Sequence, residues 1–274
     1  MSRPIHTTLR ACARPLAAAL LTAGLCAPSQ AQQLLAPSAT VASFSQSYLT
    51  AALAQWELSF PAATNPLLDT TGANSGLGDM GKYFFLASSF SPDPVVRSVT
   101  VRSDQVLVFS PTAVIFYAVP GDPYQTEAEM RADAVQALGE TSNLLVTVNG
   151  APALLPAGVS SLQEFRQFGP LVPLNVPPGS VFDSFGLPTG TYPSVTLGIT
   201  YAMEALPVGQ HQLRFTSTST PIGAYAGFDP VSYDITYNIT AVPEPGTVAM
   251  LCLGLAVVGA GVMRQRRVDQ AMAA

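Results

Sequence analysis

Catalysis of the Ser-His-Asp kind and the binding of zinc or copper both use histidine, and residues 32–242 of this chain contain a single one, His211. A serine nucleophile needs an imidazole beside it, and zinc or copper needs several histidine or cysteine ligands. His211 alternates with Leu213 and Phe215 in an expected strand, so the three share a face. We therefore expect a core or rim histidine with hydrogen-bonded ring nitrogens, and no catalytic residue, cofactor or transition-metal site.

Oxygen-bearing side chains gather in the Gly-rich segment 69–81, where Asp69, Asn74 and Asp79 could ligate calcium. Hard oxygen ligands on a flexible loop suit that ion, although the spacing does not match an EF-hand. Asp and Asn also stabilise turns by bonding their own backbone. A turn is the favoured interpretation, and a calcium site remains the alternative.

Two carboxylates facing each other across a cleft could hydrolyse a glycosidic bond. Glu127 begins an expected helix, and Glu129 and Asp133 lie on one face of it. Arg131 stands between those two, which favours a solvated helix face. The remaining candidates are isolated along the chain: Glu57, Glu164 and Glu204.

Exposed aromatic side chains could stack on sugar rings. Most aromatic residues of a β-rich domain should pack in its core. The segment 221–230 is the strongest candidate for an exposed aromatic loop, because Tyr225 and Phe228 lie beside Gly223 and Gly227. These two residues are the candidate stacking platform, and packing is the favoured interpretation.

The elements that must position these residues are mostly strands. Residues 233–240 alternate apolar and polar side chains, which is typical of a half-buried strand. Residues 206–209 predict a turn that joins strands 195–203 and 211–216 as a hairpin-like pair. Further strands are expected over 83–87, 95–101, 106–109, 114–119 and 144–148. This pattern predicts a mainly β fold, a single β-sandwich-like domain over residues 32–242.

One or two short helices interrupt the strands. Thr126 and Glu129 have capping-box spacing, 127–138 is rich in helix formers, and Gly139 suits a helix end. A second helix is expected over 46–55, although 56–60 could be a strand. The prolines of 151–190 predict a loop-rich region with at most short edge strands.

Charge and cysteine content restrict the partners of this domain. Residues 32–242 contain 15 acidic and six basic residues, a formal charge of −9, which would repel nucleic acid and anionic lipid. The three cysteines all lie outside this range, at Cys12, Cys26 and Cys252. The domain therefore needs no disulfide.

Both ends of the chain have the composition of targeting segments. Three arginines precede the apolar run 16–27, and the small residues Ser29 and Ala31 stand where signal peptidase reads the chain. Residues 1–31 are therefore predicted to be a signal peptide, cleaved after Ala31, that directs export through the Sec translocon. Near the other end, Pro243-Glu244-Pro245 precedes 17 largely apolar residues, 247–263. A helix of that length spans about 26 Å, slightly less than a hydrocarbon core of about 30 Å.

Arginines follow this expected transmembrane helix directly, at Arg264, Arg266 and Arg267. Under the positive-inside rule they stay cytoplasmic together with the tail 268–274, so the 32–242 domain lies outside. Pro-Glu-Pro, a short apolar span and an arginine cluster resemble the PEP-CTERM sorting signal, here 243–267. The resemblance implies an exosortase that recognises and processes the tail, in bacteria that often make extracellular polysaccharide.

The domain itself resembles a group of uncharacterised secreted bacterial proteins. The similar segments are 56–62, 65–74, 83–87 and 206–211. That resemblance implies that the domain is a fold unit, and it supplies no information about an activity. We expect a non-enzymatic exported protein, held transiently at the inner membrane and then located at the cell surface or in its matrix. Extracellular polysaccharide is one partner that this location suggests. The alternatives are a glycan- or calcium-binding module and a carboxylate-based hydrolase.

Overall fold

The computed structural model describes residues 32–121, 126–182, 186–244, 246 and 250. All of them belong to one compact unit of the chain. The predicted signal peptide, 1–31, lies outside the described residues, as does the predicted transmembrane helix 247–263 apart from Met250. None of the helices that the described residues form has the length and hydropathy required of a membrane span.

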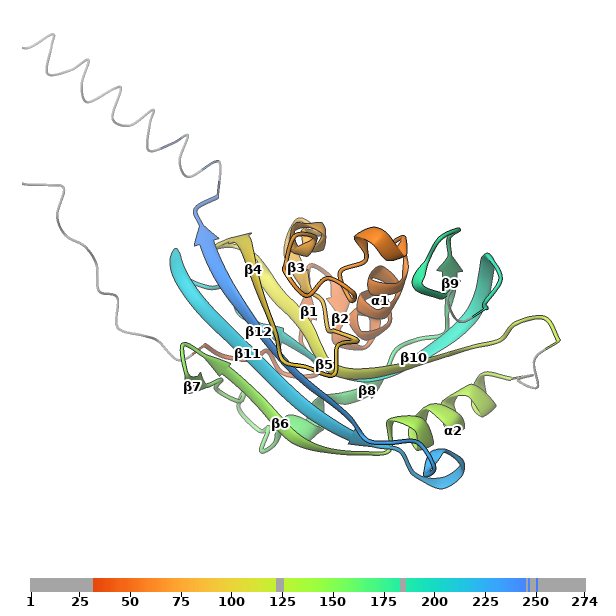
Figure 1. The fold of residues 1–274 in the computed structure, drawn as a ribbon. Helices are drawn as coiled ribbons and strands as arrows, with labels where there is room; N and C mark the ends of the chain where they lie inside the picture. The colour runs from red at the N-terminus through yellow and green to blue at the C-terminus, as the bar shows by residue number, and fades with distance from the viewer. Residues whose placement is uncertain (1–31, 122–125, 183–185, 245, 247–249, 251–274) are drawn as a thin grey trace, which may run out of the picture. The chain divides into compact units, whose positions relative to one another are not determined.

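Two five-stranded sheets form the body of the domain (Figure 1). Sheet I contains β3 (Tyr83–Leu86), β5 (Val106–Tyr117), β10 (Gly190–Met203) and β8 (Arg166–Phe168) in that order, with β9 (Val172–Val176) also paired to β10. Sheet II contains β4 (Val95–Arg102), β12 (Val231–Val242), β11 (Gly209–Thr220), β6 (Glu140–Val148) and β7 (Ala151–Pro152). A separate pair joins β1 (Thr40–Val41) to β2 (Phe44–Ser45). Most pairs are antiparallel, whereas β3 with β5 and β4 with β12 are parallel.

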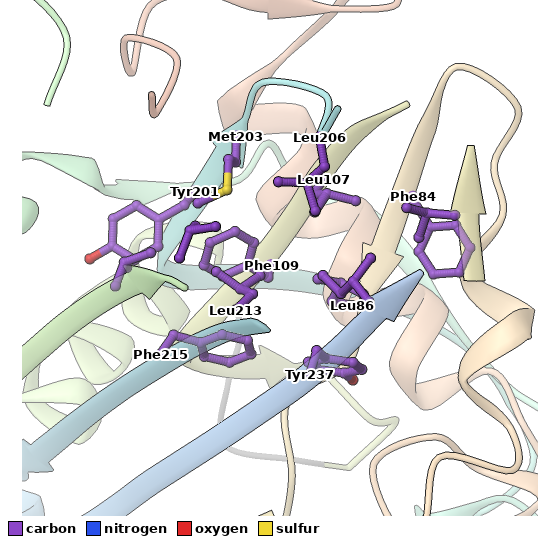
Figure 2. Close-up of a cluster of buried hydrophobic side chains, with 14 of the residues drawn as sticks. Phe84, Leu86, Leu107, Phe109, Tyr201, Met203, Leu206, Leu213, Phe215 and Tyr237 are labelled. Atoms are coloured by element: carbon purple, nitrogen blue, oxygen red, sulfur yellow. The ribbon is translucent and has the colours of Figure 1, made fainter. Parts of the chain in front are cut away.

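The core lies between the two sheets, as Figure 2 shows. Phe109 and Tyr201 of sheet I meet Phe215 and Tyr237 of sheet II, and the rings of Phe109 and Phe215 stack with centroids 4.9 Å apart. Each of these side chains is buried because alternate residues of its strand face the opposite sheet. The mainly β, sandwich-like fold is therefore confirmed.

Two helices cover sheet I on opposite sides (Figure 1). Helix α1 (Gln46–Leu58) packs Leu49 and Leu53 against Val108 and Ala202. Helix α2 (Glu127–Leu138) packs Ala134 and other residues against Leu197.

The helix predictions differ in their outcome. Helix α2 has the predicted bounds, with both bonds of the Thr126–Glu129 capping box and Gly139 at its end, at φ 58°. Helix α1 continues past residue 55 to Leu58, so a strand over 56–60 is wrong. The physical reason is that the last turn buries Trp56, Glu57 and Leu58 beneath neighbouring segments, which an extended chain would not do.

The strand predictions over 106–109 and 114–119 belong to one strand, β5. Its register with β10 shifts between Ile199 and Tyr201, so that Ser110 and Pro111 form a bulge. The Ser110 hydroxyl bonds the carbonyls of Thr112 and Ile199 there, which keeps the chain in the sheet across the proline.

The hairpin predicted between 195–203 and 211–216 is wrong. Strand β10 pairs with β5 in sheet I, whereas β11 pairs with β12 and β6 in sheet II. The connection crosses the core instead of turning back, and Leu206 is 1% exposed within it. In the region 151–190 the strands β7, β8 and β9 are short, as predicted.

Candidate functional site

The last turn of α1 places a carboxyl group in the interior. Glu57 follows Leu53 by four residues, so the two side chains point from the same buried face of the helix. Glu57 is 7% exposed. Its Oε1 accepts hydrogen bonds from the Ser88 backbone N–H at 2.7 Å and from the Ser88 hydroxyl at 2.9 Å.

Burial changes the acid strength of this group. Desolvation raises the pKa of Glu57 from 4.5 to about 7, against the opposing effects of the Ser88 hydrogen bonds and the charge of Arg97. Glu57 therefore exists as a mixture of neutral and ionised forms near neutral pH. Such perturbed groups gather at functional sites, although structural networks also produce them.

Arg97 is a second buried charge beside it. It is 1% exposed, and its Nη1 donates to the carbonyls of Ala87 and Ser88 and to the Tyr237 hydroxyl at 2.7–2.9 Å. Its Nε donates to the Asp69 carbonyl at 2.7 Å. Arg97 therefore links two segments to sheet II: the loop at Asp69 and the segment that follows β3.

From the sequence, Glu57 was only one of several isolated candidate carboxylates, and Arg97 was assigned no role. A signal for Arg97 does exist, because it occupies the inward position between Val95 and Val99 in the alternating pattern of β4. The burial of Glu57 could have been predicted from its position four residues after Leu53, if the helix had been extended to Leu58.

A cavity of about 120 Å³ opens at Glu57. Its walls are largely apolar and come from α1, the segment after β3 and the edge of β5, with Phe182 and Tyr233 completing them. A small apolar cavity with one buried carboxyl group is suited to binding a small molecule or to exchanging a proton.

His211 occupies the rim position expected for it. It is half-buried, with Nε2 2.7 Å from the Pro207 carbonyl and Nδ1 3.3 Å from Asn149 Nδ2. Both ring nitrogens therefore have hydrogen-bond partners, as predicted.

Two of the candidate calcium ligands, Asp69 and Asp79, accept hydrogen bonds from protein groups. The Asp69 carboxylate accepts from the backbone N–H groups of Thr71, Gly72 and Asn74. Partial burial raises its pKa, but these bonds outweigh that effect and hold the pKa below the ordinary value. Asp79 accepts from Gly81, from Gln105 and from Arg102 at 3.1 Å. The Asp69 bonds and the Gly81 bond are those of turns, whereas Arg102 and Gln105 reach Asp79 from another segment, and the calcium site stays a prediction.

The other carboxylates have local partners. Glu127 pairs with Arg131 at 2.7 Å, Glu129 closes the capping box, and Glu164 bonds Ser160. Among the described residues, no three His, Cys, Asp or Glu side chains gather closely enough to hold a metal ion. A hydrolase using two of these carboxylates stays a prediction.

The predicted aromatic loop lies against α2. The rings of Tyr225 and Phe228 stack with centroids 6.0 Å apart, and Tyr225 also meets Phe116 edge-on at 5.8 Å. Gln136 of α2 holds the loop by accepting from the Ala224 N–H at 2.9 Å. Phe228 is 67% exposed, so this pair combines a packed ring with an accessible one.

The folded domain extends directly to the predicted sorting motif. Val242 is the last residue of β12, where it pairs with Arg102, and its carbonyl accepts from the Ser103 N–H at 2.8 Å. Pro243 and Glu244 follow at once and are half-buried. Pro245 and the arginines Arg264, Arg266 and Arg267 lie outside the described residues.

Comparison with known proteins identifies this tail. Residues 241–267 match the PEP-CTERM protein-sorting motif. Searches of curated proteins and of solved structures give no match. The chain therefore carries a PEP-CTERM protein-sorting motif, the signature of an exosortase-sorted protein exported to the cell envelope or surface.

Proposed function

We propose that this chain is a non-enzymatic protein of the cell surface or its extracellular matrix. The Sec translocon exports it, signal peptidase removes residues 1–31, and the tail spans the inner membrane until exosortase processes it at Pro243-Glu244-Pro245. The observation that carries the proposal is the sorting motif at residues 241–267.

The junction between the domain and the motif supports this order of events. Val242 is still paired within sheet II, so Pro243 follows the folded domain without a linker. A domain joined this closely to a membrane span is held near the membrane until the tail is cut. Cleavage of the tail would then release the domain from the membrane.

The environment of the polar side chains supports a non-enzymatic role. The ring nitrogens of His211 are both bonded, and Asp69, Glu129 and Glu164 each stabilise a turn or a helix start. These groups have structural partners that account for them without a reaction.

Mass spectrometry of the protein from its native host tests the proposal. We expect a mature chain that begins at Gln32 and ends between Pro243 and Gly246. The variant Glu244→Ala should accumulate in the membrane with its tail, whereas the matched exposed change Glu204→Ala should be processed normally. A wild-type product that keeps residues 263–274 in the membrane fraction would refute sorting by cleavage and leave a plain anchor.

Binding of a glycan is a second candidate function, favoured by the exposure of Phe228 beside Tyr225. Sugar rings stack on accessible aromatic faces of this kind. Binding of the host's own extracellular polysaccharide should be lost in Phe228→Ala. It should persist in Phe44→Ala, which alters another exposed aromatic pair, Phe44 with Tyr48. Equal binding by both variants would exclude this loop as the site.

A further inference from the structure

The cavity at Glu57 lies where sheet I is incomplete. Strand β3 ends at Leu86, which pairs with Phe109, whereas β5 continues to Tyr117. The cavity lies along this further part of β5, where Ala113, Val114 and Ile115 line it. Among the described strands, β10 alone pairs with these three residues. The recess is thus a consequence of the different lengths of two neighbouring strands.

Two residues that line this recess each have a polar atom without a hydrogen-bond partner among the described residues. Glu57 uses Oε1 for both bonds to Ser88, and its Oε2 has none. Tyr233, on β12, lines the same cavity, and its hydroxyl has none either. Both side chains line the same cavity, and the pKa of Tyr233 is raised by burial and further by the charge of Glu57.

The remaining polar groups of the wall are already engaged. The Ser110 hydroxyl bonds two carbonyls, and Thr112 shares a hydrogen bond of 2.8 Å with Ser219. The Ser88 hydroxyl bonds Glu57. A ligand would therefore meet one carboxyl oxygen and one phenolic hydroxyl in otherwise apolar surroundings that include Leu58, Leu67 and Phe182.

The size and charge of the cavity restrict the ligand further. A volume of about 120 Å³ is somewhat below that of the apolar protein cavities of about 150 Å³ that bind benzene, so the ligand can be no larger than about one six-membered ring. An anion would be repelled by Glu57 in its ionised form. A cation would have to lose its hydration between largely apolar walls, a cost that one carboxyl group offsets only in part. A neutral molecule avoids both costs.

We propose that this cavity binds a small neutral molecule with one hydroxyl group on a compact apolar ring, of the phenol or cyclic alcohol class. The hydroxyl donates to Glu57 Oε2 and accepts from the Tyr233 hydroxyl. The ring fills the space between Leu58, Leu67 and Phe182. A hydroxyl group fits because it is the smallest group that donates and accepts at once.

Carboxyl-carbon NMR of the full-length protein labelled at the glutamate Cδ tests this directly, with phenol and toluene as probes. Toluene matches phenol in shape and lacks the hydroxyl. At about pH 8 Glu57 is mostly ionised and accepts hydrogen bonds. Phenol should shift the Glu57 resonance in a saturable way and leave the exposed Glu204 resonance unmoved. Toluene should bind at least about five-fold more weakly, the loss expected for a missing hydrogen bond.

Variants separate the proposed contact from general apolar binding. Glu57→Gln assigns the Glu57 resonance by its disappearance. Tyr233→Phe retains the ring and the carboxyl probe, and should weaken phenol binding about five-fold while leaving toluene unchanged. The matched change Tyr48→Phe, at an exposed tyrosine, should alter neither. The proposal fails if the Glu57 resonance does not respond to phenol, if phenol and toluene bind equally, or if Tyr233→Phe leaves phenol affinity unchanged.

Discussion

Glu57 should make the stability of this domain depend on pH in a direction opposite to that of an ordinary paired carboxylate. The pKa of its carboxyl group is 4.5 in the unfolded chain and about 7 in the folded one. Between these values the folded state holds a proton that the unfolded state has lost, so the free energy of unfolding falls as pH rises. One pKa unit corresponds to about 1.36 kcal/mol, which gives a total loss of about 3 kcal/mol.

The contribution of Glu57 is fully present below about pH 4.5, declines through the interval and is lost above about pH 7. Urea unfolding of the wild type and of Glu57→Gln from about pH 4 to 8.5 isolates it, because the other titrating groups are common to both proteins. The stability of Glu57→Gln relative to the wild type should rise by about 3 kcal/mol across this range. Glu204→Gln, at an exposed position, should follow the wild type throughout.

A difference between wild type and Glu57→Gln that stays flat with pH would refute the reasoning, since it would show that burial does not disfavour the ionised form. A difference of the opposite sign would mean that Arg97 stabilises the carboxylate more than burial opposes it. Carboxyl-carbon NMR of Glu57 gives the folded-state pKa independently.

Three further substitutions test the packing by urea unfolding. Arg97→Met should destabilise the domain by about 3 kcal/mol or more, because it removes the Arg97 donor from the Ser88 and Asp69 carbonyls and from the Tyr237 hydroxyl. A loss below about 1 kcal/mol would contradict this. Gly139→Ala should cost about 3 kcal/mol, since its Cβ would lie 1.9 Å from the Thr220 carbonyl oxygen at φ 58°; a neutral result would show that the loop adapts. Thr126→Ala should cost about 1 kcal/mol, and Thr126→Ser should retain the cap.

Local signals in the sequence predicted local structure well. Helix α2 was predicted at its observed bounds because the capping box and Gly139 act within a few residues of one another. The strands β4 and β12 were predicted from their alternation, which reflects burial of one face. The joining of 106–109 to 114–119 was missed, because the Ser110 bond to Ile199 that maintains β5 across Pro111 comes from a strand 89 residues away.

The local signals in the sequence could not predict which strands pair with each other. A turn at 206–209 suggested a hairpin, but whether the chain turns back or crosses to the other sheet depends on which strand buries the residues on each side. Leu206 enters the core between the sheets, and this favours the crossing. The candidate cavity was missed for a related reason, since its walls come from segments as distant as α1, β5 and β12.

The sequence by itself determined the sorting motif at 241–267, because a motif read by another protein is encoded in adjacent residues and needs no fold to display its pattern. Only the tertiary structure decided the roles of Glu57 and Arg97. The protonation of Glu57 and the hydrogen bonds of both residues depend on burial and on partners far along the chain: Ser88 is 31 residues from Glu57, and Tyr237 is 140 residues from Arg97. A buried charge is stabilised by what surrounds it, and the fold alone brings those surroundings together.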